Sequence, residues 1–144
     1  MEIRKKLEEN QALQEIESYK TKMFGENILD VLDSENVEKS LRKVKPGRYL
    51  LAAVMTGVVS FDDEKNCLVQ KLIKPVESGE QKADVLYYRH NVTMGMMRDE
   101  STSNEMALTI NMMSRITGRS KQIIEKLSGQ DIRIANELSS FFFS

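Results

Sequence analysis

The C-terminal third of the chain carries helix-start and helix-stop signals in close succession, and these constrain the fold more than any other feature. The candidate helix starts are Thr102 with Glu105, Ser120, and Ser128 with Asp131. Such side chains accept hydrogen bonds from the backbone N–H groups that a first helical turn leaves free. Gly118 can adopt the left-handed conformation that ends a helix. We therefore expect three short helices, joined by tight turns, between Thr102 and Phe142.

Each of these helices has an apolar stripe that must be covered. The stripes comprise Met106, Ile110, Met113 and Ile116, then Ile123, Ile124 and Leu127, and finally Ile132, Ala135, Leu138 and Phe142. The segment from Arg48 to Val59 is apolar nearly all round, which marks it as the most buried element. Its length favours a helix, although Val58 and Val59 leave a strand open. We expect the three helices to pack against this segment.

The N-terminus predicts an amphipathic helix from Met1 to Met23, with Gly25 as its stop. The apolar stripe of this helix is thin and consists of Ile3, Leu7, Leu13, Ile16 and Met23. A helix of this kind is marginal in water without tertiary packing. We therefore expect it to pack on a neighbouring chain or on the body of its own, and we expect the protein to self-associate.

The middle of the chain gives weaker signals. We expect two helical segments between Glu26 and Val44, followed by a turn at Pro46-Gly47. An acidic surface turn is expected from Phe61 to Asn66, and an exposed loop from Met94 to Ser103. Between them lie two β-prone runs, Leu68 to Ile73 and Val85 to Tyr88. Two β-prone runs around a turn are compatible with a β-hairpin. Their short length leaves a loop as the alternative.

Together these patterns predict a mainly α fold, a compact helical domain with an N-terminal amphipathic helix and room for a small β-hairpin in the middle. The expected domain organisation has two parts. Residues 1–45 form an N-terminal helical arm, and residues 46–144 form a helical core domain. Residues 61–101 are expected as a loop or hairpin inserted in that core.

Composition narrows the classes of partner. The 144-residue chain has 21 basic and 22 acidic residues and a formal net charge of -1, so no global field draws it to nucleic acid or an anionic membrane. Its longest apolar stretch, Tyr49 to Val59, is shorter than the roughly 20 residues that span a bilayer. Cys67 is the only cysteine, which excludes an intramolecular disulfide. We expect a cytoplasmic protein that does not enter the membrane.

The sequence offers no constellation of catalytic residues. His90 and Cys67 are the only histidine and cysteine, and they lack the count and spacing of a metal site. The acidic run Asp62-Asp63-Glu64 lacks the alternating oxygen ligands of a calcium loop. No glycine-rich loop between a strand and a helix is present to hold phosphate. We therefore expect no enzymatic activity, no cofactor and no metal.

Two features make DNA binding the alternative function. The first is a basic cluster around the Pro46-Gly47 turn, formed by Lys39, Arg42, Lys43, Lys45 and Arg48. The second is the segment from Thr117 to Ser140, in which two short helices are spaced as in a helix–turn–helix motif. Arg133 is the only cation of the would-be recognition helix, whereas phosphate contacts normally supply much of the affinity for DNA. We therefore regard nucleic acid as an unlikely partner and keep a DNA-binding regulator as the alternative.

The segment from Ile110 to Phe142 resembles the C-terminal signature of tail assembly chaperones of contractile-tailed phages and prophages. In that family a helix ends in a motif like R-I-T-G, and a short helix follows. An L-x-x-x-D motif comes next, and a last helix ends in a phenylalanine pair. The corresponding residues here are Arg115 to Gly118, Leu127 to Asp131, and Phe141-Phe142. Ser40 to Ala53 resembles the family's L-R-x-P-x-x-x-D-L element, with Pro46 two positions late and no following aspartate.

The resemblance implies a protein-binding role without catalysis. Family members coat the long tape measure protein and keep it soluble until tail tube subunits displace them. The implied partners are the tape measure protein and, in addition, the tail tube protein. The implied location is the host cytoplasm, and the protein is not expected in the mature virion.

The N-terminal stripe with Ile3, Leu7, Leu13 and Ile16 is the candidate surface for packing against a second copy. Two further apolar surfaces are candidates for binding a client or a second copy. The first is a methionine-rich loop and helix with Met94, Met96, Met97, Met112 and Met113. Methionine suits such a surface because its unbranched side chain repacks at low cost. The second is the C-terminus, where three consecutive phenylalanines cannot all face inward on a helix. We expect Phe141 and Phe142 to complete the core and Phe143 to face a partner.

Overall fold

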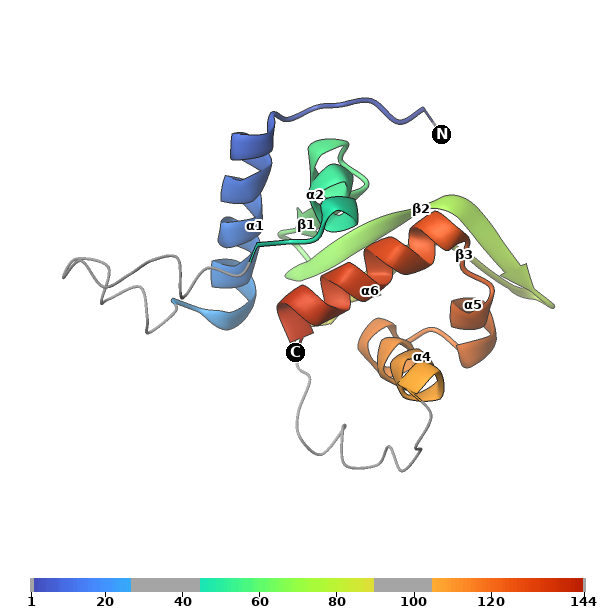
Figure 1. The fold of residues 1–144 in the computed structure, drawn as a ribbon. Helices are drawn as coiled ribbons and strands as arrows, with labels where there is room; N and C mark the ends of the chain where they lie inside the picture. The colour runs from blue at the N-terminus through green and yellow to red at the C-terminus, as the bar shows by residue number, and fades with distance from the viewer. Residues whose placement is uncertain (1, 27–44, 90–104, 144) are drawn as a thin grey trace.

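A three-stranded antiparallel sheet organises the protein, and helices pack on it (Figure 1). The computed structural model describes residues 2–26, 45–89 and 105–143, with residues 105, 106 and 108 described by their backbone alone. The expectation of a mainly α fold is wrong, because strands and helices both contribute to the core. The helical segments expected between Glu26 and Val44 and the loop expected from Met94 to Ser103 lie outside the described residues.

The sheet has the order β1-β2-β3, with β1 (Val59–Asp62), β2 (Cys67–Ser78) and β3 (Gln81–Tyr88). Strand β1 is a third strand that the sequence did not predict. The expected hairpin is present as β2 and β3, and its strands are longer than predicted. Its two-residue loop contains Gly79, whose φ of 63° suits a tight turn between strands. Pairing of β2 with β3 is irregular between Lys71 and Val76, and Pro75, which has no N–H to donate, lies in this interruption.

Gly57 explains why the apolar segment from Arg48 to Val59 is not a single helix. The apolar segment begins as α2 (Arg48–Met55), which ends at Thr56. Gly57 follows with a φ of 77°, and the chain then enters β1 at Val59. The segment expected as one helix from Arg48 to Val59 is therefore a short helix followed by a strand. The left-handed residue redirects the chain, and the β-branched residues after it favour the sheet.

The N-terminal helix, α1 (Glu9–Phe24), begins eight residues later than expected. Residues 2–8 are not helical because the N–H groups of Lys6 and Leu7 donate to the Met55 carbonyl, at 2.7 and 3.0 Å. Glu8 and Gln11 form a capping box that starts the helix there. The predicted stop is confirmed, since Gly25 caps α1 with a φ of 80°.

The apolar stripe of α1 packs on the body of its own chain, which is one of the two arrangements expected. Ala12, Ile16, Tyr19 and Met23 are buried, and α1 lies against α2. The Tyr19 ring stacks on Phe61 of β1, with 5.9 Å between the centroids. Phe61 therefore belongs to the sheet and not to the expected surface turn.

The three C-terminal helices are confirmed as α4 (Glu105–Thr117), α5 (Lys121–Glu125) and α6 (Gly129–Phe143). In Figure 1, α1 and α2 lie on one side of α6, and α4 and α5 lie on the other. Only α6 of the three packs extensively on α2, whereas the main contacts of α4 and α5 outside the unit are with the hairpin. No helix in the described ranges is both long enough and apolar enough to cross a membrane.

Candidate functional site

Local capping interactions shape the unit formed by α4, α5 and α6. Gly118 has a φ of 70°, and its N–H donates to the Ser114 carbonyl at the end of α4. The Ser120 hydroxyl oxygen accepts the Ile123 N–H at the start of α5. The Ser128 hydroxyl oxygen accepts the Asp131 N–H at the start of α6, at 3.3 Å. These three signals were visible in the sequence, and they fix how the three helices turn relative to one another.

A buried polar network fastens this unit to the sheet. The Asp131 side chain is fully buried, and its carboxylate accepts the backbone N–H groups of Ile73 and Lys74, at 2.9 and 3.0 Å. Gln70 donates to the Asp131 carbonyl and accepts the Tyr88 hydroxyl at 2.6 Å. Burial raises the pKa of Tyr88 above its ordinary value of 10.0, and the nearby Asp131 adds to the rise. The network holds α6 at the interruption in the β2–β3 ladder.

Glu137 joins the same unit to α2. Its carboxylate accepts the N–H of Tyr49, at 3.1 and 3.3 Å, and that of Leu50 at 3.4 Å. These are N–H groups that the first turn of α2 leaves without partners inside the helix. A negative charge at this end also complements the helix dipole. The position of α6 is therefore set from both sides, by α2 and by β2.

An apolar groove lies between α4, α5 and α6, and it is the candidate functional site. Its volume is about 470 Å³, and it is lined by Thr109, Ile110, Ile124, Glu125, Leu127, Ile132 and Asn136. Ile110, Leu127 and Ile132 are half-buried and come from three different parts of the unit. Thr109, Glu125 and Asn136 are exposed and supply the polar rim. Grooves with an apolar floor and a polar rim are suited to binding apolar groups of a partner.

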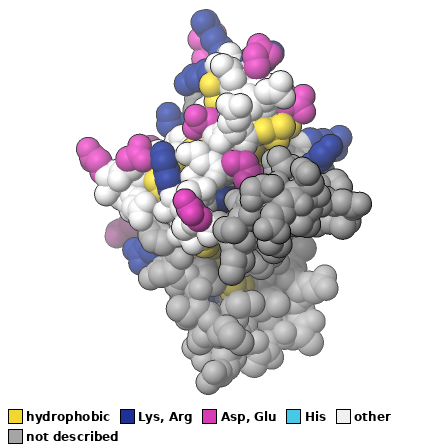
Figure 2. Space-filling model, turned by 90° about the vertical axis from the view of Figure 1, so that its left-hand side faces the viewer, with side chains coloured by type: hydrophobic (Ala, Val, Ile, Leu, Met, Phe, Trp, Pro, Cys, Tyr) yellow, Lys and Arg dark blue, Asp and Glu magenta, His cyan; other side chains and the backbone are white. Residues whose placement is uncertain are grey.

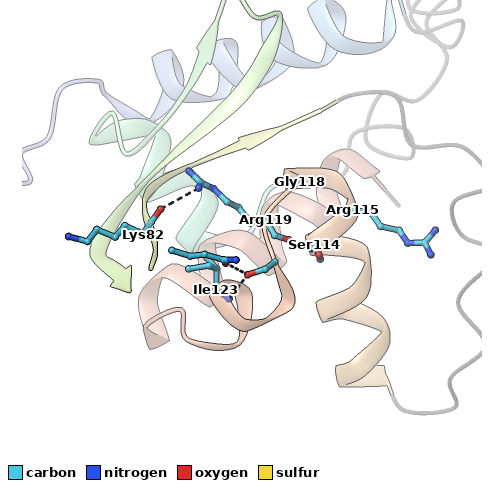
Figure 3. Close-up of a pocket in the computed structure, with 8 residues that line it drawn as sticks. Lys82, Ser114, Arg115, Gly118, Arg119 and Ile123 are labelled. Atoms are coloured by element: carbon cyan, nitrogen blue, oxygen red, sulfur yellow. Dashed lines mark hydrogen bonds between the residues drawn. The ribbon is translucent and has the colours of Figure 1, made fainter. Parts of the chain in front are cut away.

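A second cleft, of about 610 Å³, lies on the hairpin side of α5 and is basic (Figure 3). It is lined by Gln81, Lys82, Ser114, Arg115, Gly118, Arg119, Ser120 and Ile123. Figure 3 shows the side chains of Lys82 and Arg115 extending in opposite directions. The Arg119 guanidinium donates to the carbonyls of Lys82 and Val85, both at 3.3 Å. The three cations therefore do not converge on a common point, as a small anion would require.

The methionines expected at a client surface fall into three groups. Met113 is fully buried in the core and is not available to a client. Met112 is partly buried and packs against the core. Met94, Met96 and Met97 lie outside the described residues. The sequence pattern predicts that the apolar residues of the groove, Ile110, Ile124, Leu127 and Ile132, lie on helix faces covered by the core. A sequence pattern shows which residues share a helix face, but not which part of that face stays open.

The residues of the N-terminal stripe, the candidate surface for a second copy, differ in how exposed they are. Ile16 is buried in the core, Leu7 packs against it and Leu13 is half-buried. Ile3 is 42% exposed and precedes α1. Figure 2 shows the side of the molecule that carries α1, where acidic and basic side chains are interspersed with small hydrophobic areas. The larger share of the stripe is therefore used for packing within the chain.

The C-terminal phenylalanines make an aromatic cluster at the end of α6. Phe142 is buried, as expected. Phe143, expected to face a partner, is partly buried and stacks on the Tyr88 ring with 6.4 Å between the centroids. Phe24 meets Phe143 edge-on at 6.3 Å and is itself 53% exposed. Phe143 therefore packs between α1 and β3, and Phe24 is the more exposed ring.

The described residues contain no group of three or more metal-binding side chains. Cys67 is buried at the start of β2, and burial raises the pKa of its thiol above the ordinary 9.0. A raised pKa reduces the thiolate fraction, which is the reactive form. His90, the only histidine of the sequence, lies outside the described residues.

Comparison with known proteins gives no significant match, whether to a family model, a curated protein or a solved structure.

Proposed function

We propose that this protein is a tail assembly chaperone of a contractile-tailed phage or prophage. It binds the tape measure protein and keeps it soluble until tail tube subunits polymerise around it. The apolar groove between α4, α5 and α6 is the observation that carries the proposal. Apart from Thr109, the residues that line the groove lie within Ile110 to Phe142, the segment whose motifs resemble that family. A chaperone of this kind needs an open apolar surface on a rigid support, and the capped helices supply one.

The contacts that position the groove support this role. The buried Asp131 carboxylate and the Glu137 carboxylate hold α6 to β2 and α2. The groove wall that α6 contributes through Ile132 is therefore fixed before any partner binds. A preformed groove loses less conformational entropy on binding than a mobile one.

The DNA-binding alternative gains no support from the described residues. Its recognition helix would be α6, but α6 packs against both α2 and β2 and buries Ile134, Ala135 and Leu138. Arg133, its only cation, donates to the Tyr49 hydroxyl at 2.6 Å. Of the basic cluster around the Pro46-Gly47 turn, only Lys45 and Arg48 are described.

The test is co-expression with the tape measure protein encoded in the same phage or prophage. Wild type keeps the tape measure protein in the soluble fraction and co-purifies with it. Leu127→Gln, in the groove, reduces both. The matched control is Leu51→Gln, which changes a half-buried leucine of α2 that does not line the groove. A tape measure protein that sediments despite wild type would refute the function, and full activity of Leu127→Gln would refute the groove as its site.

Location and assembly belong to the same proposal. The protein acts in the host cytoplasm and is not in the mature virion, so mass spectrometry of purified particles would find the tail tube protein and not this chain. Self-association is measured by light scattering across a concentration series. A mass equal to one chain at every concentration would contradict it.

A further inference from the structure

We propose that the occupant of the groove is an amphipathic helix of the client that carries a lysine or arginine beside its apolar stripe, facing Glu125. This inference rests on the proposed function and specifies the chemistry of the client segment. It follows from two properties of the groove, the secondary structure of its walls and the charge on its rim.

The walls favour a helical occupant. They are formed by α4, α5 and α6, whose backbone groups are largely paired within their own helices, and the sheet contributes no lining residue. An extended peptide would find no strand edge here with which to pair its backbone. A helix keeps its own hydrogen bonds and can place side chains from successive turns against Ile110, Leu127 and Ile132.

The rim favours a basic flank on that helix. Among the residues that the structure describes, Glu125 is the only charged one that lines the groove, and its side chain is exposed. In the described part of the chain it has no salt-bridge partner, although Lys121 lies one turn before it on α5. The cations Lys82, Arg115 and Arg119 line the second cleft and not this groove. The exposed Glu125 carboxylate therefore attracts a cation of the client at the rim of this groove.

The experiment uses two synthetic helical peptides of about five turns with the same leucines at i, i+3, i+4 and i+7. One peptide has lysines beside this stripe and the other has glutamates at the same positions. Binding to the full chain is followed by fluorescence anisotropy at low and high salt. We expect the lysine peptide to bind about three- to ten-fold more tightly at low salt. We expect this preference to shrink as salt rises.

Three variants assign the preference to this site. Glu125→Lys reverses the preference, and Glu125→Gln reduces it, while Leu127→Gln weakens the binding of both peptides. The matched control is Glu80→Lys, which makes the same charge change at an exposed position in the hairpin loop. Glu80→Lys leaves the preference as in wild type.

The outcomes separate this inference from the proposed function. Equal binding of the two peptides to wild type, or an unchanged preference in Glu125→Lys, overturns the basic flank. In that case co-expression with the tape measure protein still tests the chaperone function by itself. Conversely, a tape measure protein that sediments with wild type overturns the function even where the peptides discriminate as expected.

Discussion

Asp131→Asn tests the contact that joins the three-helix unit to the sheet. The carboxylate is fully buried and accepts three hydrogen bonds. Two come from the backbone N–H groups of Ile73 and Lys74, and the third comes from the Ser128 hydroxyl at 2.8 Å. The β2–β3 pairing is interrupted between Lys71 and Val76, so the carboxylate takes the place of a strand partner for these N–H groups.

The expected loss follows from hydrogen-bond counting. A hydrogen bond to a charged group contributes about 1.5–3 kcal/mol, and a buried N–H left without an acceptor costs about 1–3 kcal/mol. Asparagine has nearly the same shape as aspartate, but only one of its terminal atoms accepts. It can serve one of the two backbone N–H groups, and its NH₂ faces the other. We therefore expect Asp131→Asn to lower the free energy of unfolding by about 3 kcal/mol, and the melting temperature by about 10 °C.

Urea denaturation followed by circular dichroism measures this loss, with an unchanged m-value as the check that the transition stays two-state. The control is Asp84→Asn, the same substitution at an exposed position of β3, which should change stability by less than about 0.5 kcal/mol. If Asp131→Asn unfolds at the wild-type midpoint, or if both variants lose equally, the carboxylate does not anchor α6 as described.

Four further predictions use the same assay. Glu137→Ala removes the carboxylate that accepts the Tyr49 N–H at the start of α2, and it should lower the free energy of unfolding by about 1–2 kcal/mol. An unchanged free energy of unfolding would mean that this contact does not stabilise α2. Phe142→Ala should lower the free energy of unfolding by about 3 kcal/mol, because Phe142 is buried. Phe143 is only partly buried, so Phe143→Ala should lower it by about 1–2 kcal/mol, and the reverse order would contradict the packing of the two rings. Ser139→Ala should stabilise by about 1 kcal/mol, because the buried hydroxyl has no partner among the described residues, and a loss would reveal one. Burial raises the pKa of Tyr88, so above pH 10.0 the folded state keeps a proton that the unfolded state loses, and the free energy of unfolding should fall as pH rises. Tyr88→Phe should make this fall less steep. The same slope of unfolding free energy against pH in wild type and Tyr88→Phe would refute the prediction.

Part of the candidate site could be predicted because its determinants are local. The helix ends at Gly118, Ser120 and Ser128 depend on side chains and backbone groups within a few residues of one another, so the sequence alone indicates them. The groove itself was not predicted. Whether Ile110 and Ile132 are covered or left open depends on how three helices are spaced, and that spacing is set by contacts with residues far away in the chain.

The sequence by itself determined the three C-terminal helices and the end of α1, because Gly118, Ser120, Ser128 and Gly25 each act within about one turn. It left the middle segment open between a hairpin and a loop. Only the tertiary structure decided that the apolar segment continues past Gly57 as a strand of the sheet, because a short apolar run suits a buried helix and a buried strand equally. Tertiary contacts also decided that Met113 lies in the core and that Phe143 packs on Tyr88. The physical reason is the range of the interaction. Capping acts between neighbours in the chain, whereas burial depends on which distant segments meet.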